Sequence, residues 1–167
     1  LIPTYRFVAL YGSPAFPSLG SLGEQDLEQS VARVKELASQ YQPLSDETVI
    51  PSFEIITTIA SAGLTENNDY SQELDPSTIK PWIDKAKEQG IYVVLDLQPG
   101  RTSFLTQVKQ YESLLLEPHV GLAVDPEWRL QTEKDRHLVR TGSVTADELN
   151  QTSTWLANLV AENKLPQ

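Results

Sequence analysis

The chain contains no cysteine and no methionine among its 167 residues. Without cysteine, disulfide bonds, zinc–thiolate sites and catalysis by a thiol are excluded. Long hydrophobic runs are also missing, since none approaches the roughly 20 apolar residues that a helix needs to cross a bilayer. We therefore expect no transmembrane segment.

Basic residues are scarce. The 13 Lys and Arg residues stand against 23 Asp and Glu residues, which gives a net charge of −10. Because no basic patch is available, neither nucleic acid nor an anionic membrane surface is an expected partner.

Length and composition are typical of a single globular domain over residues 1–167. The hydrophobic content of 40% and the charged content of 22% are ordinary for such a domain, and the length allows a sizeable core. The chain begins with Leu1 rather than Met, so we expect that an upstream segment has been removed.

Hydrophobic periodicity predicts four strands, each followed by a helix. The strands are expected at residues 5–12, 48–60, 91–97 and 119–124, and the helices at 24–41, 75–90, 104–115 and 145–164. Polar runs at 66–69 and 131–142 are expected to be solvated loops. The alternation of strand and helix indicates a parallel sheet with right-handed crossovers, so the expected fold class is α/β.

The polar residues of these strands share a phase. Alternate residues of a strand face opposite sides of a sheet. If the apolar residues pack outward against helices, the polar residues near the strand ends face inward together. These inward-facing residues are Tyr11, Glu54, Asp96, Gln98, Asp125 and Glu127. A doubly wound sheet would bury apolar residues on both faces, so this phase favours a barrel with a polar mouth.

Four strand–helix units make half of an eightfold barrel, which takes about 250 residues. We therefore expect the chain to be the N-terminal half of a TIM-like (β/α)8 barrel. The missing half would come from the continuation of a longer chain or from another copy, which makes a second half-barrel the expected partner.

The stretch from His119 to Trp128 carries the strongest functional signal, because an apolar strand ends there in two acids, Asp125 and Glu127. Two carboxylates at the end of a buried strand are costly unless they are used. Glycoside hydrolysis needs two carboxyl groups around the scissile bond, and a cavity of low dielectric constant raises the pKa of an acid. We expect Glu127 to be the general acid, with Asp125 or Asp96 as its partner.

Further residues are expected to bind substrate. Trp128 and Tyr11 offer rings that stack on a sugar, and Glu54 faces the same cavity. The turn from Gln98 to Arg101 leads into a helix N-terminus, where either an anion site or a plain Pro-Gly turn is expected.

The segment Gly121-Leu-Ala-Val-Asp-Pro-Glu127 resembles the Asp-x-Glu signature that closes the fourth strand of barrel glycoside hydrolases, such as family-18 chitinases and family-25 lysozymes. In those families the Glu is the general acid and the Asp assists it. The resemblance implies these roles for Glu127 and Asp125. The further upstream acids of the chitinase motif are absent from this chain.

Three longer segments, 51–54, 93–101 and 118–130, resemble uncharacterised secreted or lipoprotein-type barrel proteins of high-GC Gram-positive bacteria. This resemblance implies an exported protein, either secreted or associated with the cell envelope. The leading hypothesis is a secreted glycoside hydrolase that acts on a cell-envelope or environmental polysaccharide, with no cofactor and no metal ligand assigned.

Three alternatives stay open. The inward-facing carboxylates offer the oxygen ligands that Ca²⁺ or Mg²⁺ prefers, which would make a metal-dependent hydrolase or lyase. The same barrel could bind carbohydrate without catalysis. Glu127 could also form a purely structural ion pair with Arg129 or Arg101. Of the two histidines, His119 is expected to be structural and His137 to be solvated.

Overall fold

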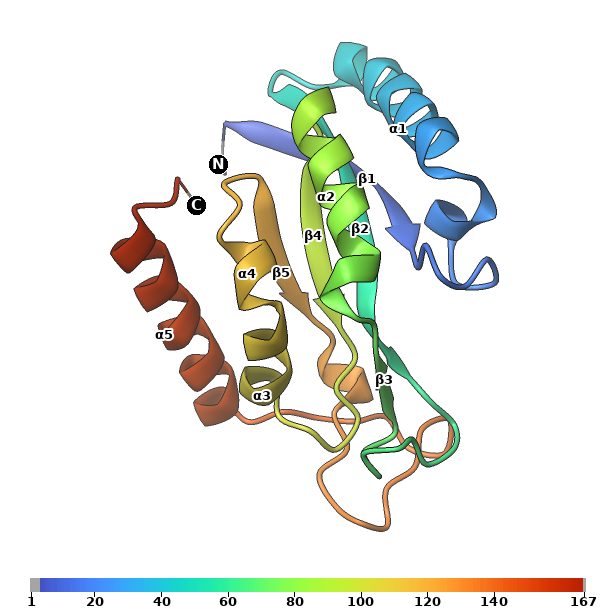
Figure 1. Cartoon of the computed structure of the whole chain (residues 1–167), viewed down its shortest axis with the longest axis vertical. Helices are drawn as coiled ribbons and strands as arrows, with labels where there is room; N and C mark the ends of the chain where they lie inside the picture. Colours follow the sequence, from blue (N-terminus) through green and yellow to red (C-terminus); the bar gives the residue numbers. More distant parts are fainter. Residues whose placement is uncertain (1–3, 167) are drawn as a thin grey trace.

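The computed structural model describes residues 4–166, which form an α/β fold around one sheet (Figure 1). Leu1, on which the expectation of a removed segment rests, lies outside the described residues. The strands are β1 Tyr5–Gly12, β2 Thr48–Ala60, β3 Ser71–Glu73, β4 Tyr92–Leu97 and β5 Val120–Val124. The helices are α1 Leu27–Tyr41, α2 Pro76–Gln89, α3 Phe104–Val108, α4 Glu112–Leu115 and α5 Ala146–Asn163.

Local chemistry fixes the ends of the longer helices. Asp26 caps α1 by accepting a hydrogen bond from the backbone N–H of Gln29, whose side chain bonds back to the backbone of Asp26. Asp75 caps α2 by accepting from the N–H of Ser77, and Gly90 ends α2 in the left-handed conformation, with φ of 67°. The ends predicted for α2 are therefore confirmed, whereas α1 begins three residues later than predicted because Asp26 is its cap.

Two predicted elements differ from the structure. The sequence predicts no strand at Ser71–Glu73, yet β3 pairs antiparallel with the last residues of β2. Three residues are too few to give a periodic signal. The helix predicted over 104–115 is interrupted, since the 3-10 turn η3 Lys109–Tyr111 separates α3 from α4. At this turn the buried phenol of Tyr111 donates its O–H to the backbone oxygen of Leu74 at 2.9 Å.

Four of the strands run parallel in the spatial order β1-β2-β4-β5. This is the order that consecutive strand–helix units produce when each new strand is added beside the previous one. Within residues 4–166, β1 and β5 are therefore the edge strands. In the same part of the chain, no helix is long and apolar enough to cross a membrane.

Helices cover one face of the sheet and leave the other uncovered (Figure 1). Strand residues on the covered face pack in one hydrophobic core with residues of α1, α2, α3, α4 and α5, and several of them are at most 2% exposed. They include Leu10, Phe53, Ile55, Val93 and Leu95. On the uncovered face, Ile56 and Asp96 near the carboxyl ends of the strands are buried. Most of the other residues on this face are only partly buried. They include Phe7, Ile50, Tyr92, Val94 and Gly121. The predicted phase, with apolar residues toward the helices, is confirmed.

Replacing Tyr111 by Phe is expected to lower the free energy of unfolding by about 1 to 2 kcal/mol. The carbonyl oxygens of Leu74 and Thr57 would lose the O–H that reaches them at 2.9 and 3.3 Å in the core. Urea unfolding measures this change. Tyr41→Phe is the matched control, because the Tyr41 side chain is 49% exposed, and should change stability by less than about 0.5 kcal/mol. Equal losses for the two variants would contradict the structural role of the Tyr111 O–H.

Candidate functional site

The predicted inward-facing residues gather at the carboxyl ends of the parallel strands, on the uncovered face. Tyr11 of β1 is aligned with Glu54 of β2. Asp96 of β4 is aligned with Ile56 of β2 and with Ala123 of β5. Aligned residues of neighbouring strands face the same side of a sheet. The three polar side chains therefore share one face and one edge of the sheet.

Tyr11 reaches across β2 to the strand beyond it. Its phenol O–H donates to Oδ2 of Asp96 at 3.3 Å, and its oxygen accepts from the side-chain amide of Gln98 at 3.4 Å. Gln98 is itself fixed, because its Oε1 accepts a hydrogen bond from the backbone N–H of Ala60 at 2.9 Å. Side chains from β1, from the end of β4 and from the backbone of β2 are thereby tied together.

Asp96 is the most buried acid of the group, with 1% of its surface exposed. Its Oδ1 receives no hydrogen bond from a donor of the described residues, although a buried carboxylate oxygen requires one. Burial, and then the nearby charges of Asp125 and Glu54, raise the pKa of Asp96 to about 7. Asp96 therefore keeps a proton into the neutral pH range, which a freely solvated Asp does not.

The neighbouring groups are shifted in the same direction. Burial and repulsion by Glu127 raise the pKa of Asp125, and hydrogen bonding with Gln98 and Asp96 opposes this rise. Burial and repulsion by Asp125 raise the pKa of Glu54. Because each carboxyl group affects the next, they titrate as a coupled set rather than singly. We call Tyr11, Glu54, Asp96 and Asp125 the carboxyl cluster.

Glu127 lies just outside the carboxyl cluster, in the 3-10 turn η4 Pro126–Trp128 that follows β5, and its side chain is exposed. Its charge raises the pKa of Asp125 and contributes to the raised pKa of Asp96. Glu127 is therefore the exposed acid of this set, whereas Asp96 is buried and Glu54 and Asp125 are half-buried.

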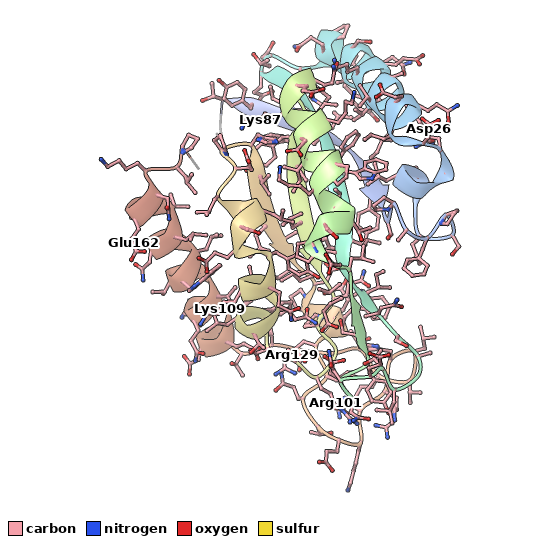
Figure 2. The ribbon with its side chains drawn as sticks, in the orientation of Figure 1. Asp26, Lys87, Arg101, Lys109, Arg129 and Glu162 are labelled. Atoms are coloured by element: carbon pink, nitrogen blue, oxygen red, sulfur yellow. The ribbon has the colours of Figure 1, made fainter. Side chains whose placement is uncertain are left out.

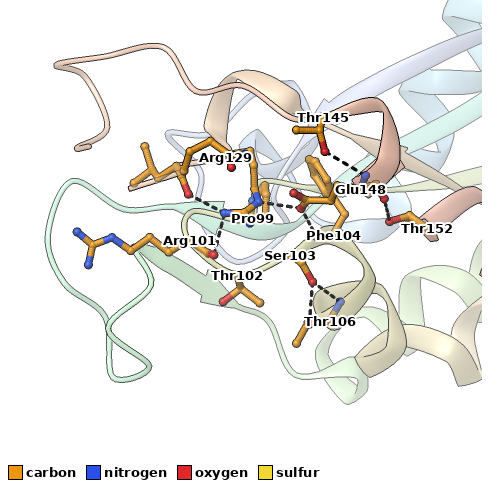
Figure 3. A network of polar contacts seen from close by, with 12 residues as sticks. Pro99, Arg101, Thr102, Ser103, Phe104, Thr106, Arg129, Thr145, Glu148 and Thr152 are labelled. Carbon is orange, nitrogen blue, oxygen red and sulfur yellow. Dashed lines mark hydrogen bonds and ion pairs between the residues drawn. The ribbon is translucent and has the colours of Figure 1, made fainter. Parts of the chain in front are cut away.

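The alternative in which Glu127 pairs with Arg129 or Arg101 is not what the structure shows. Arg129 instead pairs with Glu148 of α5 at 2.8 Å, and the side chains are only 13% and 15% exposed (Figure 3). The guanidinium of Arg129 also donates to the backbone oxygens of Gly100 and Arg101, at 3.3 and 2.8 Å. Arg129 thus fastens the segment after β5 to the turn after β4, and the carboxylate of Glu127 forms no ion pair within residues 4–166.

Arg101 contacts other groups than the carboxyl cluster. It lies at the end of the molecule toward which the parallel strands run (Figure 2), with its guanidinium 4.7 Å from the centre of the Tyr70 ring. The turn at Arg101 leads into the N-terminus of α3, where an anion site was one expectation. This position is occupied by Glu148 of the same chain, whose Oε1 accepts a hydrogen bond from the backbone N–H of Phe104 at 3.3 Å. The turn is therefore used to attach α5.

Two residues predicted to lie in solvated loops are buried. His137 is 4% exposed and its ring lies edge-on to that of Trp128, with the centroids 5.3 Å apart. Asp69 is 5% exposed and accepts hydrogen bonds from the hydroxyls of Thr65 and Thr102, at 2.7 and 2.6 Å. These two predictions were wrong because a polar run carries no signal for burial when distant loops cover one another.

A pocket of about 240 Å³ opens beside Glu127, between η4 and the following loop. It is lined by Glu127, Trp128, Leu138, Val139, Arg140 and Thr141. The last four of these residues were not among the site residues predicted from the sequence. Their one signal in the sequence is the pair of adjacent aliphatic residues, Leu138 and Val139, inside a charged loop; both are more than 80% exposed.

The described acidic side chains are not arranged as a divalent cation needs. Among the described residues, no three His, Asp or Glu side chains are placed so that they could hold one metal ion. The carboxyl cluster instead reduces its charge by retaining protons, as the raised pKa values of Asp96, Asp125 and Glu54 indicate.

The fold and the site define an α/β protein with coupled carboxyl groups at the carboxyl edge of a parallel sheet. No protein-family model matches this chain, and comparisons with curated proteins and with solved structures gave no match either.

Replacing Asp96 by Asn is expected to stabilise the protein, and the gain should grow with pH. The folded pKa of about 7 lies above the ordinary value of 3.8, so the folded state holds a proton that the unfolded state lacks between these values. The stability that this proton contributes is lost as the pH rises from about 4 to about 7. Above about pH 7 Asp96 is ionised in the folded state, and the full free-energy cost of burying its charge is present. The gain in Asp96→Asn should be small near pH 4 and on the order of 2 to 4 kcal/mol near pH 8.

Urea unfolding of both proteins across this pH range measures the difference. Asp84→Asn, on the exposed side of α2, is the matched control and should show no such pH dependence. A gain for Asp96→Asn that is constant with pH would contradict the buried, protonated state of Asp96.

Proposed function

We propose that this chain carries the acid/base groups of a glycoside hydrolase acting on a cell-envelope or environmental polysaccharide. One observation supports this above the others. Glu54 of β2, Asp96 of β4 and Asp125, which directly follows β5, lie close enough to affect one another's pKa, and the pKa of Asp96 is raised to about 7. Coupled carboxyl groups that divide protonated and ionised roles are what glycoside hydrolysis uses.

In this proposal Glu127 is the general acid, because its carboxyl group is exposed next to Asp125. It gives its proton to the glycosidic oxygen as the bond from that oxygen to the anomeric carbon breaks. A water molecule then adds to the anomeric carbon, and its proton passes to a carboxylate of the cluster. Asp125 links Glu127 to the proton held by Asp96. The rings of Tyr11 and Trp128 are the proposed sugar-stacking surfaces.

The proposal includes a barrel of which these strands form one half. Three features support this: the parallel order β1-β2-β4-β5, helices on one face only, and a polar mouth at the carboxyl ends of the strands. Active sites of eightfold barrels lie at this end. A second set of four strand–helix units, from a longer chain or another copy, would pair with β1 and β5 and enclose the uncovered face.

A polysaccharide of the envelope or the surroundings is met outside the membrane. The proposal therefore includes export, either as a secreted protein or as one attached to the envelope. This part is supported by the sequence resemblance to secreted and lipoprotein-type proteins.

Replacing Glu127 by Gln in the full protein is expected to lower the rate of sugar release at least about 100-fold, because general acid catalysis contributes that much. The measurement is release of reducing ends from soluble chitin oligosaccharides and from purified peptidoglycan. Stability should change little, since the Glu127 side chain is exposed. Glu162→Gln on α5, also exposed, is the matched control and should keep full activity.

An active and stable Glu127→Gln variant would refute the catalytic assignment. Binding of these glycans without any released product, unchanged in the variant, would favour a carbohydrate-binding protein. Activity that a chelator removes would favour the metal-dependent hydrolase.

A further inference from the structure

The two ring nitrogens of His137 both face oxygen atoms that only accept hydrogen bonds. Nδ1 lies 3.0 Å from the backbone oxygen of Ser61, and Nε2 lies 2.9 Å from the backbone oxygen of Trp128. The side chain is 4% exposed, so water does not replace either contact. Ser61 directly follows β2, whereas Trp128 closes η4, so the ring joins segments that are distant in the sequence.

A neutral imidazole has one N–H donor and one lone pair. In that form one of the two contacts would place a lone pair against a carbonyl oxygen at about 3 Å, which is repulsive. Only the imidazolium donates to both oxygens. We infer that His137 is held as an imidazolium, and that in this form it positions Trp128 and the pocket beside Glu127; its role in catalysis rests on the proposed function.

Two aromatic rings pack against His137, and two cations lie over one of these rings. The Tyr70 ring lies edge-on at 6.3 Å between centroids, and the Trp128 ring lies edge-on at 5.3 Å. The guanidinium groups of Arg101 and Arg136 lie 4.7 and 5.0 Å from the centre of the Tyr70 ring. The direct polar contacts of the His137 ring are therefore the two carbonyl oxygens, and the guanidinium groups lie against Tyr70.

Acidic groups also lie on the neighbouring segments. Asp135 precedes His137 in the same loop; its carboxylate accepts from the N–H of Thr132, and its pKa is lowered mainly by that bond. Asp69 precedes Tyr70, and Glu127 precedes Trp128. All three carboxylates carry negative charge on segments next to His137.

The position of this ring determines the walls of the pocket. One wall is Glu127 and Trp128, and the other is formed by residues 138–141 of the loop that carries His137. The loop returns close to η4, where the N–H of Gly142 donates to the backbone oxygen of Glu127 at 2.6 Å. A side chain at position 142 would not fit, because its Cβ would lie 2.7 Å from the same oxygen. When the imidazole loses its second proton, one of its two carbonyl contacts is lost and the two walls are less firmly joined.

The state of the ring is measured directly by NMR. The chain has only two histidines, so the spectrum of His119→Gln assigns the signals of His137. The ¹⁵N shifts of the His137 ring and the exchange protection of the Gly142 amide are recorded together. The titration runs from about pH 6 upward until the His137 ring loses its second proton. Protection is expressed relative to the intrinsic exchange rate, so that the pH dependence of exchange itself is removed.

We expect His137 still to be an imidazolium at about pH 8, where an ordinary imidazole is neutral. We also expect a fall of roughly tenfold or more in Gly142 protection once His137 loses its proton, as the loss of a charge-assisted hydrogen bond implies. In His137→Gln, protection should be low and independent of pH. In His119→Gln it should follow the unchanged protein. If His137→Gln does not fold, the titration of the unchanged protein alone decides.

A neutral ring with one tautomer at about pH 8 would overturn the inference. Loss of the second proton without any change in Gly142 protection would overturn it as well. Neither measurement uses a substrate, so an inactive protein that passes both would refute the proposed function and leave the inference standing.

Discussion

Burial of the Asp96 carboxyl group is the constraint on which the candidate site depends. A carboxylate that loses its water must gain hydrogen bonds or a positive partner, or else keep its proton. Asp96 has the Tyr11 hydroxyl at 3.3 Å on one oxygen and no donor on the other, and its neighbours Asp125 and Glu54 are themselves acids. Asp96 therefore keeps its proton, and its protonation depends on the charges of the neighbouring acids.

The strands and the loops contribute differently to this arrangement. The parallel strands fix Tyr11, Glu54 and Asp96 through backbone register, which leaves each side chain little freedom. Glu127 follows the last strand and depends instead on the loops. The buried ion pair of Arg129 with Glu148, at 2.8 Å, attaches its segment to α5. Removing one partner of such a pair would leave an uncompensated charge that is largely buried, so breaking this attachment is costly.

Much of the fold could be predicted from local patterns. Phe53 and Ile55 alternate with Glu54, and Leu95 alternates with Asp96, so the covered and uncovered faces of β2 and β4 followed from the sequence. What could not be predicted had no local pattern. β3 is three residues long, and its pairing with the end of β2 depends on a turn that the polar composition does not specify.

In the candidate site too, some features could be predicted from local patterns and others could not. The convergence of polar residues at the strand ends followed from strand phase, whereas the partners of Arg129 and Arg101 did not. Arg129 is two residues from Glu127, yet it pairs with Glu148, which lies 19 residues further along the chain. His137 was expected in solvent and is buried under Tyr70 and Trp128.

The sequence by itself determined the alternation of strands and helices, the direction that each strand side chain faces and the gathering of acids at one edge of the sheet. These depend on backbone geometry that repeats every two or 3.6 residues, so neighbouring residues suffice to specify them. Only the tertiary structure decided that Asp96 is the buried acid, that Glu127 is the exposed one and that His137 joins the loops around them. Loss of solvent and the choice of a charged partner depend on segments that meet only when the chain is folded.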